Sequence, residues 1–126
     1  MFNVVAIALG AAIGANLRYG LSTWAAQRLG TTWPYGTFLV NILGCLAIGI
    51  LLTLAATRLS LSEPLRLFLV TGLLGGFTTF STFGYESFTL FTRGDWLGAS
   101  LYIGGSVIVG LAAVFLGAGL ARLLGP

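Results

Sequence analysis

The chain of 126 residues has few groups that could perform acid–base or metal chemistry. It contains no histidine, three acidic residues and a single cysteine, Cys45, which lies inside an apolar run and has no partner for an intramolecular disulfide. Acid–base catalysis, metal binding and nucleophile activation depend on the residue types that are scarce here. We therefore predict that the protein is not an enzyme, and that Cys45 is a small packing residue.

Charge is also scarce. Charged residues make up 7% of the chain, whereas about a quarter is typical of soluble domains. The apolar share is 57% and the mean hydropathy is +1.01. The net charge of +3 does not indicate a nucleic-acid partner, because the arginines are scattered singly, without a basic stripe. This composition is typical of a membrane protein.

The uncharged segments are long enough to cross a bilayer. A helix needs about 20 apolar residues to span the hydrocarbon core. Uncharged runs cover residues 1–17, 29–57, 67–85 and 96–121, and the first reaches this length if it continues past Arg18.

These runs predict an all-α membrane protein with four transmembrane helices. We expect them at about 3–26, 36–56, from 65 onward and 96–123. Only short connections remain between the spans. Residues 1–126 are therefore expected to form a single four-helix transmembrane domain, with no soluble domain and no cleaved leader.

The positive charges do not favour one orientation. The arginines divide evenly between the two sides of the membrane, with Arg58, Arg66 and Arg122 on one side and Arg18, Arg28 and Arg93 on the other. Since loop charge normally sets orientation, equal numbers allow insertion both ways, and two copies could then pair antiparallel. The alternative is a weak bias set by the amino terminus.

Small residues recur one helical turn apart in three spans. The pairs are Gly10 with Gly14, Cys45 with Gly49, and Ser106 with Gly110. Such pairs let helix backbones approach closely in lipid. They predict tight helix contacts, either between copies or within one chain.

Residues 72–84 form the most unusual stretch. Gly75 and Gly76 are followed by four hydroxyl residues between Thr78 and Thr82. This composition disfavours a continuous helix, so we predict a break near 75–79, close to mid-membrane. Carbonyls freed at the end of a half-helix can coordinate a cation, which suggests a structural ion site. The alternative is a packing surface whose hydroxyls bond to the preceding turn.

Two aromatic residues follow the predicted break. Phe80 and Phe83 share a face of the second half-helix, and their ring edges carry partial positive charge that can face an anion, although such rings are often core filler. Glu86, one turn further, could cap a helix, pair with an arginine or take part in proton-linked transport.

Polar side chains within the spans are costly and therefore tend to be functional. Asn41 could offer amide donors to an anion or could bridge two helices. Arg18 could face a vestibule and attract anions there, or could extend to the membrane surface. The other polar residues of this kind are Thr37, Tyr102 and Ser106.

The block GGFTTFSTF at residues 75–83 closely resembles the Fluc (CrcB-type) family of small fluoride channels. Further matches are a Gly-x-x-Leu-Arg pattern ending at Arg18, a Gly-Thr-x-x-Val-Asn pattern ending at Asn41, and Glu86. The resemblance covers nearly the whole chain. It implies an antiparallel, dual-topology homodimer in the inner (plasma) membrane, with two narrow pores that export fluoride passively.

The resemblance also implies roles for individual residues. The backbone carbonyls of Gly75 and Thr78 from both subunits would bind a sodium ion at the dimer centre. Phe80 and Phe83 would line the fluoride paths, and Asn41 would donate a hydrogen bond near them.

Further lining residues are implied in the same way: Thr37, Thr82, Tyr102 and Ser106, with Arg18 near the vestibule. The family's polar track can include another serine one turn after Ser106, where this chain has Gly110. Fluoride is small and strongly hydrated, so a narrow pore must replace its water contacts with many weak ones. A carboxylate in the path would repel it, so Glu86 is expected to be turned aside or neutralised.

Two other classes of protein share some of these features. A small dual-topology drug/proton antiporter has the same size and number of spans, but it needs an embedded carboxylate, typically in the first helix, where this chain has none. A non-transporting helper subunit would fit the glycine-rich faces, but it would leave the polar residues Thr37, Asn41 and Ser106 without a purpose.

Overall fold

The computed structural model describes residues 1–123, and every regular element in that range is helical. Three spans are single helices: α1 (Phe2–Leu29), α2 (Tyr35–Thr57) and α6 (Trp96–Leu123). The other span, Glu63–Thr92, consists of several helical pieces. All four are long and apolar enough to cross a membrane, which confirms the predicted all-α class and number of spans.

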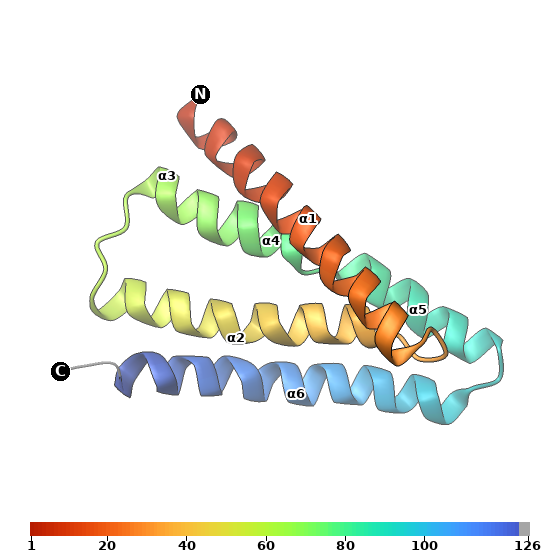
Figure 1. Ribbon diagram of the computed structural model, residues 1–126. Helices are drawn as coiled ribbons and strands as arrows, with labels where there is room; N and C mark the ends of the chain where they lie inside the picture. The colour runs from red at the N-terminus through yellow and green to blue at the C-terminus, as the bar shows by residue number, and fades with distance from the viewer. Residues whose placement is uncertain (124–126) are drawn as a thin grey trace.

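The helices pack in two pairs. Figure 1 shows α2 and α6 side by side along their length, while α1 lies obliquely across the Glu63–Thr92 span. Much of the outside consists of exposed apolar side chains, including Val4, Leu97 and Phe115. Lipid tails solvate such side chains as well as a protein core does. The outer surface is therefore suited to a bilayer.

The Glu63–Thr92 span contains four pieces in sequence. They are α3 (Glu63–Arg66), the π-helix η1 (Leu67–Leu74), α4 (Gly75–Phe77) and α5 (Phe80–Thr92). Thr78 and Thr79 separate α4 from α5 in extended conformations, with ψ angles of 160° and 121°. The interruption lies inside the predicted interval, but the π-helix was not predicted.

The expectation that the glycines take part in the break is wrong. Gly75 is helical, with φ −64° and ψ −36°. Gly76 serves close packing, because a Cβ at this position would lie 2.7 Å from the carbonyl oxygen of Ala11 in α1. The hydroxyl residues provide the break: the Thr79 side chain accepts a hydrogen bond from the Thr82 backbone N–H at 3.3 Å and so caps α5.

The glycines of α1 also serve packing within one chain. A Cβ at Gly14 would overlap the carbonyl oxygen of Leu73 and lie 2.8 Å from the backbone nitrogen of Phe77. Gly49 of α2 similarly faces the backbone of Val114 in α6. Of the two interpretations of the small-residue pairs, the structure therefore shows intrachain contacts at these glycines.

We expect Gly14→Ala to lower the stability of the protein in detergent by about 1–3 kcal/mol, because α1 must move away from the backbone of the broken span. Thermal melting would measure this change. Gly20→Ala is the matched control, since a Cβ at Gly20 has no neighbour within 4 Å. Equal melting temperatures for the two variants would contradict the packing role of Gly14.

Candidate functional site

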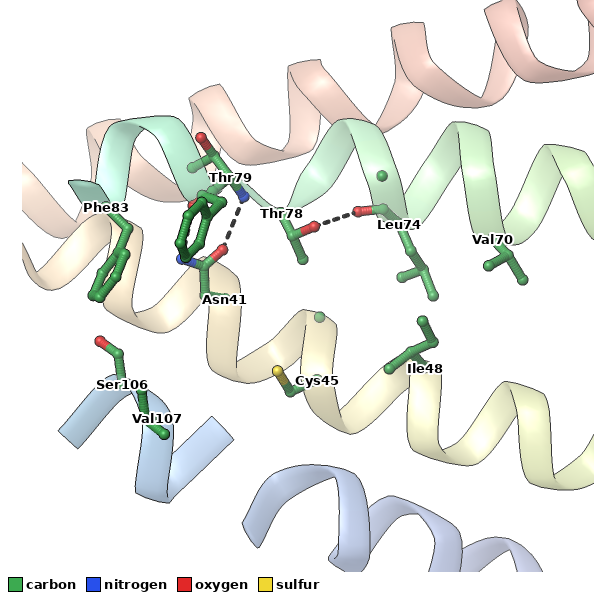
Figure 2. A pocket seen from close by; sticks show the side chains of 13 residues that line it. Asn41, Cys45, Ile48, Val70, Leu74, Thr78, Thr79, Phe83, Ser106 and Val107 are labelled. Carbon is green, nitrogen blue, oxygen red and sulfur yellow. Dashed lines mark hydrogen bonds between the residues drawn. The ribbon is translucent and has the colours of Figure 1, made fainter. Parts of the chain in front are cut away.

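A pocket of about 390 Å³ lies beside the helix break, between α2, the broken span and α6. Figure 2 shows side chains from all three directed toward this space. The structure brings together here six of the residues that the sequence singled out: Asn41, Gly75, Thr78, Phe80, Phe83 and Ser106. The other predicted site residues, Arg18, Thr37, Thr82, Glu86 and Tyr102, do not line this pocket.

Asn41 holds the break in place from α2. Its amide nitrogen donates to the carbonyl oxygen of Thr79 at 3.0 Å, and its amide oxygen accepts from the Thr79 backbone N–H at 2.9 Å (Figure 2). The amide thus satisfies both backbone groups that the break removes from the helix. The structure therefore shows the helix-bridging role of Asn41. One amide N–H remains available, so donation to an anion stays a prediction.

Most hydroxyls at the break are already engaged. The Thr78 hydroxyl donates to the Leu74 carbonyl at 2.9 Å, and the Thr79 hydroxyl donates to Thr82 Oγ1 at 2.9 Å. Ser106 differs, because its hydroxyl oxygen is buried and has no hydrogen-bond partner within residues 1–123. A buried hydroxyl without a partner is costly. Ser106 therefore carries the one pocket hydroxyl without a partner among the described residues, and its donation to an anion stays a prediction.

The two phenylalanine rings lie at one end of the pocket. Their centroids are 5.7 Å apart with an interplanar angle of 37°, and Phe83 also packs on Tyr102 at 5.2 Å. Phe80 is 84% exposed in the single chain, although it lines the pocket. The Phe80 ring thus forms part of the pocket wall, although few other side chains of the chain cover it.

Glu86 joins three helices in a hydrogen-bonded node. Its carboxylate accepts from the Thr37 hydroxyl at 2.9 Å and from the Tyr102 hydroxyl at 2.7 Å. The partners of Glu86 are thus hydroxyls of α2 and α6, not an arginine or a helix end. Thr37 and Tyr102 are buried. Both hydroxyls donate to the carboxylate, so neither is free to donate to a ligand in the pocket. Tyr102 also packs against the ring of Phe83, which lines the pocket.

Arg18 extends inward from α1. Its Nη1 atom donates to the carbonyl oxygen of Thr78 at 3.3 Å, which is one of the backbone groups exposed by the break. The structure thus places the guanidinium at the break, and the alternative of an arginine extended to the membrane surface does not hold. A role in attracting anions stays a prediction.

Sequence reasoning missed Gly44 as a residue of the pocket, and it interpreted Cys45 as a small packing residue and not as part of the site. A Cβ at Gly44 would collide with the methyl group of Thr78, so only glycine at this position leaves space for the threonine side chain. Cys45 lines the pocket and lies one turn after Asn41 on α2. The same spacing places the two residues on one face of α2.

Comparison with known proteins gives consistent matches along the chain. Residues 5–118 match the family described as CrcB-like protein, Camphor Resistance (CrcB). A fluoride-specific ion channel FluC from Chloroflexus aurantiacus is 70% identical over 99% of both chains. Proteins of the same name from Roseiflexus and Agrobacterium fabrum are 62% and 47% identical over at least 97% of each chain. The chain belongs to the CrcB-like family.

Proposed function

We propose that this protein is a fluoride-specific ion channel and not an enzyme. The observation that carries the proposal is the 70% identity, over 99% of both chains, with a relative of that name. The pocket supports it, because the free hydroxyl of Ser106 lies near the amide of Asn41 and the rings of Phe80 and Phe83. The function is passive movement of fluoride out of the cell.

The chemistry of the pocket suits a small, strongly hydrated anion. The Ser106 hydroxyl, the remaining amide N–H of Asn41 and the phenylalanine ring edges each give a weak favourable contact. Several weak contacts replace lost water without a deep well that would trap the ion. The Glu86 carboxylate accepts hydrogen bonds from Thr37 and Tyr102 and does not line the pocket.

An antiparallel homodimer completes the proposal. The even division of arginines between the two sides permits insertion in both orientations. Phe80 bounds the pocket, yet 84% of its surface is uncovered in the single chain, so a second copy can supply the missing wall. Two copies would form two pores, in the inner (plasma) membrane of the cell.

A sodium ion between the two copies is the proposed structural cofactor. Because the Thr79 N–H donates to Asn41, the Gly75 carbonyl has no donor from the next helical turn. The Thr78 carbonyl accepts from Arg18 but keeps a second lone pair. These hard oxygens fit an alkali cation in their chemistry. When bound, the ion would link the helix breaks of the two copies. The positive charge of Arg18, which contacts the Thr78 carbonyl, would weaken cation binding.

No observation favours the other two classes. A proton-coupled antiporter needs a carboxylate that exchanges protons with its substrate, but α1 contains no acidic residue and the carboxylate of Glu86 is engaged by two hydroxyls. A helper subunit would not need a buried hydroxyl without a partner, such as that of Ser106.

Purified protein in liposomes loaded with potassium fluoride tests the function. With valinomycin to balance charge, we expect rapid fluoride efflux at a fluoride electrode without any proton or sodium gradient. Liposomes loaded with potassium chloride are the matched control and should retain their anion. Efflux that stops unless protons move in the opposite direction would contradict the channel and favour an antiporter.

A further inference from the structure

The loop between α1 and α2 carries a half-buried tryptophan, Trp33, that contacts α6. Its indole nitrogen Nε1 donates to the carbonyl oxygen of Gly98 at 3.4 Å. The backbone turns tightly at Pro34, where φ is −79° and ψ is 61° and the Tyr35 N–H donates to the Trp33 carbonyl at 2.8 Å. These angles and this hydrogen bond define an inverse γ-turn. The turn and the contact with Gly98 therefore place the indole ring against α6.

Trp33 is the first of four aromatic rings in a row that ends in the pocket. Its ring meets that of Tyr102 edge to face, with centroids 5.2 Å apart and an interplanar angle of 78°. Tyr102 packs on Phe83 at 5.2 Å, and Phe83 packs on Phe80 at 5.7 Å. Phe80 and Phe83 line the pocket, whereas Trp33 and Tyr102 do not. The row therefore connects the loop to the rings that line the pocket.

Tyr102 links the two ends of this row and is completely buried on α6. Its hydroxyl donates to Glu86 at 2.7 Å, which fixes the tip of the side chain, while its ring contacts both Trp33 and Phe83. Protein interiors are closely packed, so a ring in such a position moves when its neighbour is removed. Without the indole, the Tyr102 ring can tilt toward the loop, and Phe83 then loses its support on this side.

We propose that Trp33 is a positioning residue of the fluoride pathway, which acts through Tyr102 to set the angle at which the ring edge of Phe83 faces the anion. The inference rests on the proposed function, and it adds a residue that does not line the pocket. The edge of an aromatic ring carries partial positive charge and its face partial negative charge. A tilt of Phe83 would turn part of its face toward the ion and weaken the contact.

Fluoride efflux from liposomes tests whether position 33 needs an aromatic ring. Trp33→Leu should lower efflux by about fivefold, because the directional contact with Tyr102 is lost. Trp33→Phe keeps a ring but loses the indole N–H, and efflux should stay within about twofold of that of the unmodified protein. Trp24→Leu is the matched control, since Trp24 is exposed on α1 and does not line the pocket, and it should conduct normally. Equal losses in Trp33→Leu and Trp33→Phe would overturn the inference.

A double-variant cycle with Phe83→Ile separates positioning from a general structural role. If Trp33 acts through Phe83, Trp33→Leu should change efflux by less than about twofold in a chain that already carries Phe83→Ile, because the two residues share one effect. Independent effects would multiply, and Trp33→Leu would then lower efflux by about fivefold in that chain as well. This second result would overturn the inference, since it would make Trp33 a packing residue only.

Gel filtration shows whether each variant assembles like the unmodified protein. If Trp33→Leu does not assemble, Trp33→Met takes its place in the cycle, because methionine fills irregular space without a ring. Failure of both variants to assemble would make Trp33 a residue of assembly and overturn the inference, as would normal efflux from Trp33→Leu. An absence of efflux from the unmodified protein would instead overturn the proposed function, and the inference with it.

Discussion

Asn41→Leu is expected to abolish fluoride efflux and to destabilise the protein. Leucine cannot accept from the Thr79 N–H or donate to the Thr79 carbonyl, so both backbone groups at the break lose their partner on α2. Each unsatisfied buried group costs about 1–3 kcal/mol. This loss of stability falls on the helix break, and the break positions Thr78, Phe80 and the rest of the pocket. Efflux from liposomes and thermal melting in detergent would measure the two effects.

Asn16→Leu is the matched control. The Asn16 amide donates to the Ala12 carbonyl in its own helix at 2.8 Å and is exposed, so its loss removes no contact between helices. We expect efflux and melting close to those of the unmodified protein. If Asn41→Leu conducted as well as Asn16→Leu, the break would not depend on the amide of Asn41.

The number and extent of the spans could be predicted from the sequence because both depend on local composition. Uncharged runs of sufficient length predict helices across a bilayer wherever they occur. The break was also predictable, since a run of hydroxyl residues weakens a helix through contacts within a few residues. The structure places it at Thr78 and Thr79, and every piece of the span on either side is helical.

The partners of the polar side chains could not be predicted in the same way. Asn41 meets Thr79 across 38 residues of sequence, and Glu86 meets Thr37 across 49. Such pairs depend on the depth and rotation of whole helices, which local composition does not determine. The same limit explains the error at Gly76, whose role depends on the close approach of α1 at Ala11.

Phe83→Ile is expected to reduce fluoride efflux by at least about tenfold, which corresponds to about 1.4 kcal/mol of lost contact with the ion. Phe83 lines the pocket and lies between Phe80 and Tyr102, with centroids 5.7 and 5.2 Å away. Isoleucine keeps an apolar side chain at this position but has no ring edge to face an anion. The proposed dimer should still assemble, because an apolar side chain remains at this position, while the liposomes should lose fluoride slowly.

Phe115→Ile separates the ring-edge role from a general effect of losing an aromatic residue. Phe115 lies on α6, is 77% exposed and does not line the pocket, so we expect efflux close to that of the unmodified protein. Gel filtration of both variants tests assembly, and the fluoride electrode tests conduction. Normal efflux in Phe83→Ile would show that the anion does not depend on this ring edge. A loss of efflux accompanied by loss of the dimer would assign Phe83 to assembly, because the missing contact would then be between the two copies.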